Sequence, residues 1–359
     1  MRLINTWLVC VSTSLPVLAA ASPEPQPTPL VVASWGGAYQ AVLEEVLFEP
    51  FTAATGIQVE TVPYSGGLEI LEATPPDLID MTKNAAMTAC RQGQLLRLTF
   101  DDLPDGADGT PARRDFIDSA FSECALTHLL YATVIAYDTR AFKGFIPSRV
   151  HDLFNLQDFP GKRALQDIPD GNIEWALRSF DVPRESLYPL LSTPRGMTLV
   201  FERLDALRPH TLWWQAGSEP VELLESGEVV MASGYNGRFF AAIAKGSPIQ
   251  IIWDSQIQEH QTWAIPTSAN NQAAARQFIH FATRTQRLAA VAERIAYGPA
   301  RHSASALLHK HPDGFDIRPH IPTHPYNNRT AITKDVGWYA RVRDHLHARF
   351  EQWQAGGGL

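Results

Sequence analysis

Two turns in this 359-residue chain carry groups that can bind a ligand. The first is Trp35-Gly36-Gly37, between a predicted apolar strand at 30–34 and a predicted helix at 38–53. Glycine lets backbone N–H groups approach a ligand closely, and a helix start carries partial positive charge. The amides of Gly36 and Gly37 can therefore bind an anionic or carbonyl group, and Trp35 can offer an aromatic face for stacking. A turn with only a structural role is the alternative.

The second turn is the segment 233–238 (SGYNGR), which follows a predicted strand at 229–232 and precedes a predicted apolar helix at 239–244. Tyr235 then lies at the C-terminal end of a parallel strand, where open α/β sheets place their ligands. The guanidinium of Arg238 can hold a carboxylate through two parallel N–H groups. A salt bridge at the surface is an equally good role for Arg238, and a strand, turn and surface helix without a ligand is the alternative for the whole segment. The candidate ligand-binding residues of this turn are Tyr235, Asn236 and Arg238.

The elements around these turns predict an α/β fold. Strands at 30–34, 57–63 and 78–81 alternate with helices, which favours a parallel sheet with right-handed crossovers. The apolar strand predicted at 127–137 is long enough to cross from one lobe to another. Beyond the second turn we expect, in order, a strand at 249–253, a polar loop at 254–261 and a strand closed by Pro266.

The N-terminus has the pattern of an export signal. Residues 1–21 combine Arg2, an apolar stretch and three alanines that offer a cleavage site, and residues 22–29 form a proline-spaced leader that we expect to be extended and mobile. The remaining residues, about 335, suit two α/β lobes better than one core. Removal of Arg2 changes the formal charge from −8 to −9, which argues against nucleic acid and anionic membranes as partners.

Two cysteines remain after removal of the signal, Cys90 and Cys124. In an exported protein an even pair usually forms a disulfide, which would stabilise the fold by about 3 to 4 kcal/mol. Two buried free thiols are the alternative.

Motifs for catalysis and for cofactors are absent. The sequence contains no nucleophile elbow, phosphate-cradling loop, HExxH or CxxC. The histidines at 309, 311, 320 and 324 lie between prolines without a paired acidic residue, so we predict surface roles and no metal site. We therefore expect neither an enzyme nor a cofactor.

A series of short motifs runs along the chain: Ser34-Trp35-Gly36-Gly37, the Gly161-Lys162 turn, Gly-Glu-Val-Val-Met, Tyr235-Asn236-Gly237, Ala-Lys-Gly-Ser-Pro-Ile, Trp-Ala-Ile-Pro, Phe-Ile-His-Phe-Ala, Tyr-Gly-Pro at 297–299, and the tail around Trp338-Tyr339 and Trp353. In this order and spacing they resemble a known family, the polyamine-binding branch of the bacterial extracellular solute-binding proteins. The resemblance covers nearly all of the chain after the signal.

The resemblance implies a periplasmic, monomeric, two-lobed binding protein of type II, each lobe a mostly parallel sheet with flanking helices. It implies a first lobe at 30–137 and 265–359, a second lobe at 138–264, and a hinge at crossing segments near Tyr137 and Ala264. A solute would be held between the lobes and delivered to the permease of an ABC importer. Trp35, Tyr235 and Tyr297 match aromatic residues that line the family's cleft.

Two departures from the family pattern bear on the solute. Gln261 stands where polyamine binders place the aspartate that pairs with an ammonium, and a buried ammonium without a carboxylate is costly. The acidic pair that the family carries near the start of the helix at 172–180 likewise falls on Ile168 and Gly171, although Asp167, Asp170 and Glu174 lie close enough to supply it. The main hypothesis is a polyamine or related nitrogenous solute. The alternatives are an amino-acid derivative or organic carboxylate held by Arg238, and an exported enzyme on the same fold. The predicted ligand-binding set is Trp35, Gly36, Gly37, Tyr39, Tyr235, Asn236, Arg238, Gln261 and Tyr297.

Overall fold

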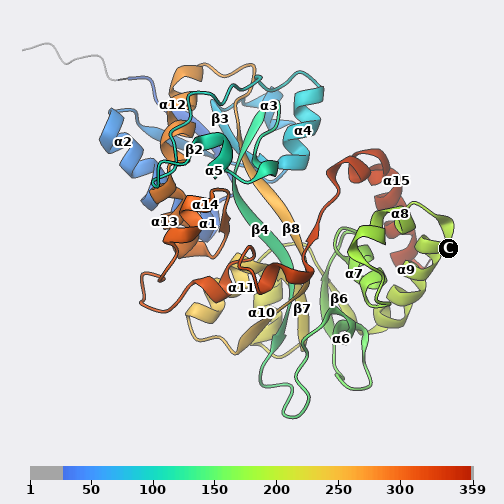
Figure 1. Ribbon diagram of the computed structural model, residues 1–359. Coiled ribbons are helices and arrows are strands. Elements are labelled where there is room, and N and C mark those ends of the chain that lie inside the picture. Colours follow the sequence, from blue (N-terminus) through green and yellow to red (C-terminus); the bar gives the residue numbers. More distant parts are fainter. Residues whose placement is uncertain (1–26, 357–359) are drawn as a thin grey trace, which may run out of the picture.

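The computed structural model describes residues 27–356, so the predicted signal peptide and the first part of the predicted leader lie outside the described residues. One sheet runs through both lobes in the order β2-β1-β3-β8-β4-β7-β5-β6, with β10 paired to β8 and β9 to β4 (Figure 1). Its strands are β1 (Leu30–Ser34), β2 (Val59–Pro63), β3 (Leu78–Thr82), β4 (Ala125–Asp138), β5 (Arg163–Gln166), β6 (Thr211–Trp214), β7 (Met231–Tyr235), β8 (Ile249–Ala264), β9 (Gly298–Pro299) and β10 (Ile332–Thr333).

Helices cover this sheet, and local capping explains several of their ends. Gly56 ends α2 in the left-handed conformation (φ 75°), and the hydroxyl of Thr82 accepts a hydrogen bond from the Ala85 N–H at the start of α4. The predicted helix at 38–53 is α1 and α2 joined by a π-helical turn at 44–48. The α-helices are α1 (Gly37–Leu43), α2 (Glu49–Thr55), α3 (Ile70–Ala73), α4 (Lys83–Arg91), α5 (Ala112–Asp115), α6 (Val150–Phe154), α7 (Asn172–Arg178), α8 (Leu187–Leu191), α9 (Pro194–Leu207), α10 (Glu219–Glu225), α11 (Asn236–Ala244), α12 (Gln272–Ala282), α13 (Thr285–Ile295), α14 (His302–Leu307) and α15 (Val336–Gln354). No helix in the described part of the chain combines the length and hydropathy needed to cross a membrane.

The two central strands, β4 and β8, connect the lobes. They pair antiparallel from Ala125 opposite Ala264 to Asp138 opposite Ile249. The first-lobe strand β3 pairs with the Ala264 end of β8, and the second-lobe strand β7 pairs with the Tyr137 end of β4. The outer strands pair parallel with one another in each lobe. Tyr137 and Ala264 therefore lie at opposite ends of the crossing pair, and the shared middle of β4 and β8 spans the boundary between the lobes.

The prediction of a polar loop at 254–261 is wrong, because these residues belong to the continuous strand β8. Two of their polar side chains, those of Gln256 and Gln258, are buried and find partners in the chain that follows α14. Gln256 Nε2 donates to the carbonyls of Pro322 and Asn327, both at 2.8 Å, and Gln258 Nε2 donates to Pro322 at 3.2 Å. Polar residues can thus occupy a central strand here, since a neighbouring segment satisfies their hydrogen bonds.

The C-terminal segment crosses between the lobes a third time. Its strand β10 pairs parallel with the middle of β8, with Ile332 opposite Ile257. The helix α15 that follows lies beside α8 and α9 (Figure 1). Trp353 packs on Phe201 with ring centroids 5.6 Å apart, and its indole N–H donates to Asp205 at 2.8 Å. The expected assignment of residues 265–359 to the first lobe thus fails for α15, because its apolar residues are buried in the core of the second lobe.

Two further contacts stabilise the first lobe. Cys90 at the end of α4 and Cys124 before β4 form a disulfide, with Cα atoms 5.8 Å apart. The carbonyl of Thr28 accepts a hydrogen bond from Asn271, so the last residues of the predicted leader rest against this lobe. The first-lobe core includes Phe51, Phe278 and Trp263.

Candidate functional site

A cleft of about 410 Å³ lies between the lobes and takes side chains from both. Its walls are largely aromatic. Tyr297 lies 5.8 Å from Tyr39 and 5.9 Å from Tyr131, and Tyr131 lies 5.9 Å from Tyr235, measured between ring centroids. Burial raises the pKa values of these tyrosines, so they are neutral at ordinary pH. Flat, neutral faces of this kind can enclose an alkyl chain and exclude water from it.

Arg238 supplies an uncommitted positive charge in the cleft. Its side chain is exposed, and among residues 27–356 no carboxylate lies within ion-pair distance of it. The residue is on the first turn of α11, and its guanidinium reaches across to the first lobe. A Cβ atom added to Gly37 would lie 3.6 Å from the two terminal nitrogens of Arg238. Glycine at 37, with φ of 63°, therefore leaves room for the guanidinium beside the start of α1.

A second charged group lies where the C-terminal segment enters the cleft. Lys334 Nζ is 2.5 Å from Asp170 Oδ1 and 3.4 Å from Glu259 Oε1. Asp170 also has His347 Nε2 at 3.2 Å and Arg343 at 3.9 Å. Burial alone would raise the pKa of Asp170, but Lys334 and its other cationic neighbours hold it well below the usual range. Both acidic residues that line the cleft are thus already paired with a cation.

A further carboxylate lies beneath the first-lobe side of the cleft. Asp80 on β3 is fully buried and accepts hydrogen bonds from the Tyr39 hydroxyl and from Gln261 Nε2, each at 2.6 Å. His128 Nε2 lies 3.1 Å away from Asp80, and the β4–β8 register shifts beside His128. Such a bulge turns a side chain toward a neighbour that regular pairing would not reach.

Most predicted site residues come together in the cleft. Trp35, Gly36, Tyr39, Tyr235, Arg238, Gln261 and Tyr297 line it. Gly37 is adjacent, behind the guanidinium of Arg238. Asn236 does not line the cleft. It is fully buried, accepts a hydrogen bond from the Ala132 N–H at 2.9 Å and donates to the Ala296 carbonyl at 2.8 Å, so it joins α11 to β4 and to the end of α13.

Sequence reasoning missed four groups at or beneath the cleft. Tyr131 was hidden in an apolar strand, and Glu259 was placed in the supposed polar loop. Lys334 follows β10, in the third crossing between the lobes. Asp80 belongs to an apolar strand, and the only sign of its role in the sequence is a charged residue at a position expected to be buried.

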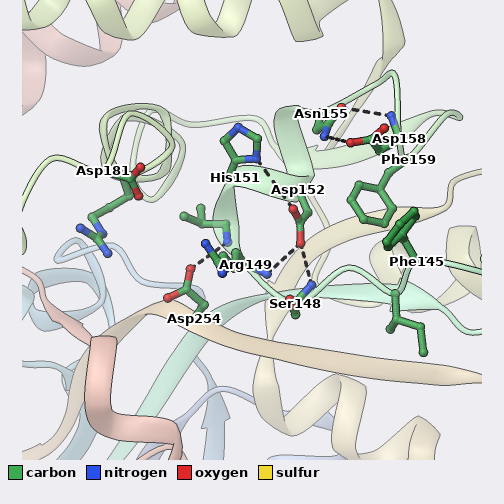
Figure 2. Close-up of a pocket in the computed structure, with 13 residues that line it drawn as sticks. Phe145, Ser148, Arg149, His151, Asp152, Asn155, Asp158, Phe159, Asp181 and Asp254 are labelled. Carbon is green, nitrogen blue, oxygen red and sulfur yellow. Dashed lines mark hydrogen bonds and ion pairs between the residues drawn. The ribbon is translucent and has the colours of Figure 1, made fainter.

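The second lobe contains another cavity, of about 500 Å³, around the start of α6 (Figure 2). Two of its acidic groups, Asp152 and Asp254, have structural partners. Figure 2 shows the Asp152 carboxylate directed at the backbone N–H groups of Ser148 and Arg149, at 2.7 and 3.0 Å. Asp254 accepts from the Val150 N–H at 2.9 Å. These bonds satisfy free N–H groups at the helix start, so this cavity is the weaker candidate for a solute site.

The geometry of the interlobe cleft is that of a binding site, with aromatic walls, a free guanidinium and a separate group of paired charges. Among the described residues, no group of three or more His, Cys, Asp or Glu side chains is placed to hold a metal ion. The fold and the site together define a two-lobed ligand-binding protein.

Comparisons with known proteins agree with this class. The family described as "Bacterial extracellular solute-binding protein" matches residues 47–323. A gamma-aminobutyric acid-binding protein of Pseudomonas aeruginosa is 32% identical over 342 residues, which cover 94% of each chain. A spermidine/putrescine-binding periplasmic protein of Escherichia coli is 23% identical over 273 residues, covering 73% of this chain and 76% of the relative. The solved structure of a GABA receptor superposes with a TM-score of 0.77 at 26% identity, covering 92% of this chain and 99% of that one.

The chain therefore belongs to the bacterial extracellular solute-binding protein family. The fold is the α/β fold of type II periplasmic binding proteins, as predicted. The protein is a solute-binding protein and not an enzyme. The polyamine-binding relative is the more distant of the two, so the comparisons favour the amino-acid alternative over the main hypothesis.

Proposed function

We propose that this protein captures a short ω-amino acid of the γ-aminobutyrate (GABA) type in the periplasm and delivers it to the permease of an ABC importer. The observation that carries the proposal is the free guanidinium of Arg238 in the interlobe cleft. A carboxylate accepts two parallel N–H bonds from a guanidinium, which fixes its orientation as well as its position. The Gly36 amide, at the first-lobe edge of the same cleft, is a further donor for that carboxylate.

The charges of the cleft fit a zwitterion better than a dication. Three basic residues, Arg238, Lys334 and Arg343, line it against two acidic residues, Asp170 and Glu259. Both acids are held by Lys334. A diamine would have to replace Lys334 as their partner, and a buried charge that loses its partner is costly. The names of two relatives, a gamma-aminobutyric acid-binding protein and a GABA receptor, agree with this choice of solute.

The aromatic walls suit the aliphatic part of such a solute. Trp35 comes from the first lobe and Tyr235 from the second, so a chain of methylene groups between them would be covered from both sides. Contacts from both lobes favour the closed form of the protein over the open form, since only the closed form makes all of them.

The experiment is a titration with five four-carbon solutes that differ only in their ends: GABA, butyrate, butylamine, putrescine and succinate. Calorimetry and thermal shift on the mature protein should show GABA as the tightest ligand. At a thousand times its Kd, a ligand adds about 4 kcal/mol to stability, which a melting curve detects readily. Tighter binding of putrescine than of GABA would contradict the proposal and support a polyamine as the solute.

A further inference from the structure

The proposed function leaves open how the cleft holds the ammonium of the ligand, because Gln261 occupies the place expected for a carboxylate. The structure offers a buried carboxylate one layer deeper. Asp80 has no exposed surface, and Gln261 Nε2 donates to its Oδ1 at 2.6 Å. Gln261 itself lines the cleft. The side chain of Gln261 therefore connects Asp80 to the ligand space.

This hydrogen bond fixes the direction of the Gln261 amide. The amide nitrogen of Gln261 is the donor to Asp80 Oδ1, so the carbonyl oxygen of the same amide points away from that carboxyl group. Within residues 27–356 the Gln261 Oε1 atom has no hydrogen-bond partner, and it is not among the buried polar atoms left without one. The oxygen is thus an oriented acceptor at the surface of the cleft.

Asp80 is in turn held in place from other sides. The Tyr39 hydroxyl donates to Oδ2 at 2.6 Å, and His128 Nε2 lies 3.1 Å from Oδ1. β3 and β8 pair antiparallel with Thr82 opposite Gln261, so Asp80, two residues before Thr82, lies on the same face of the sheet as Gln261. Sheet pairing and side-chain bonds together leave the carboxylate little freedom to turn away.

Arg238 and Asp80 are both close enough to Tyr297 to act electrostatically on its hydroxyl. Burial is the main cause of the raised pKa of Tyr297, but the charge of Arg238 lowers it and the charge of Asp80 raises it. The Tyr297 ring is also 5.8 Å from the ring of Tyr39, which bonds Asp80. Arg238, Tyr297 and Gln261 line the same cleft, so one short chain with opposite charges at its ends has a partner for each end there.

We propose that Gln261 and Asp80 form the ammonium subsite of the cleft, in which Gln261 Oε1 accepts an N–H of the ligand and Asp80 supplies the negative charge from behind. The proposal rests on the proposed function, since it assigns the second end of the same solute. Asp80 does not touch the ligand, so it is a positioning and charge-supplying residue. An amide oxygen polarised by a buried carboxylate binds a cation more strongly than the oxygen of a free amide does. With the ammonium at this subsite, Lys334 keeps both of its carboxylate partners, Asp170 and Glu259.

The test compares GABA with butyrate, which lacks only the ammonium, by calorimetry and by competition. In the wild-type protein GABA should bind more tightly than butyrate. Asp80→Asn keeps the shape and removes the charge, and Gln261→Met keeps the length and removes the acceptor. Each should lower the affinity for GABA about tenfold and leave that for butyrate within about twofold, because only the ammonium contact is changed. If Asp80→Asn does not fold, Gln261→Met alone decides the test through the same ratio.

The matched control is Asp115→Asn. Asp115 is an equally buried first-lobe aspartate that pairs with Arg301 at 2.8 Å and does not line the cleft. Its replacement should lower the melting temperature without changing the preference for GABA over butyrate.

Glu259 is the competing ammonium partner. If Glu259→Gln abolishes the preference for GABA while Gln261→Met preserves it, the proposed subsite is wrong although the proposed function stands. If a folded Asp80→Asn protein kept the wild-type preference for GABA over butyrate, Asp80 would not supply the charge and the proposed subsite would be wrong. Failure of the wild-type protein to bind GABA would overturn the proposed function itself, and the subsite with it.

Discussion

Replacing Arg238 with glutamine should remove the carboxylate site and spare the fold. The exposed guanidinium has no ion-pair partner among the described residues, so its loss breaks no charged contact in the free protein. In the closed complex it would make two charge-assisted hydrogen bonds, each worth about 1.5 to 3 kcal/mol. Glutamine retains a single neutral donor. We expect a loss of about 2 to 4 kcal/mol, which is a 30- to 1000-fold weaker Kd for GABA.

Calorimetry with GABA and with butylamine measures this effect. Only GABA should lose affinity, because butylamine carries no carboxylate. Arg114→Gln is the matched control, since Arg114 is an exposed arginine on α5 that does not line the cleft. Both variants should melt within about 1 °C of the wild-type protein, as surface substitutions usually do. If Arg238→Gln bound GABA as tightly as the wild-type protein, the assignment of the carboxylate to Arg238 would be refuted.

Three further predictions concern packing and pH. Trp35→Ala should weaken ligand binding by more than about 1 kcal/mol without unfolding the protein, and unchanged calorimetric affinity would exclude a stacking role. Gly237→Ala should lower both ligand affinity and melting temperature, because its Cβ would lie 2.7 Å from a ring carbon of Tyr297, whereas Gly144→Ala, with nothing within 4 Å, should change neither. Burial lowers the pKa of His260 to about 4, with a smaller contribution from a nearby lysine. The unfolded chain, with a histidine pKa near 6.5, therefore takes up the proton first as pH falls. The stabilisation from neutral His260 is complete above about pH 6.5 and is lost toward pH 4, by about 3 kcal/mol. Denaturant unfolding of His260→Gln should show a correspondingly smaller pH dependence over that window.

Much of the fold follows from local sequence patterns. The apolar run predicted at 127–137 is β4 at 125–138, and the strand predicted at 78–81 is β3. These segments are recognisable because residues buried on both faces of a sheet form a continuous apolar run. The full length of β8 could not be recognised in this way, because its middle carries glutamines whose hydrogen-bond partners come from residues 322–328.

The candidate site was predicted only in part. Trp35, Tyr235 and Arg238 stand in turns at strand ends, where local chemistry and chain topology both indicate a ligand. Asn236 follows the same turn, yet its amide is used to join backbone segments. A sequence shows that a polar side chain is present at a turn, but not whether a distant backbone group will satisfy it.

The sequence by itself determined the turn chemistry, the buried crossing strand β4 and the pair of cysteines, because glycine conformation and apolar runs act over a few residues. Only the tertiary structure decided which charges remain free in the cleft. Asp170 and Glu259 are committed to Lys334, Asp80 is committed to Gln261, and Arg238 is left without a partner among the described residues. Ion pairing depends on which side chains meet across elements far apart in the chain, and that is set by the packing of the lobes and of the C-terminal segment.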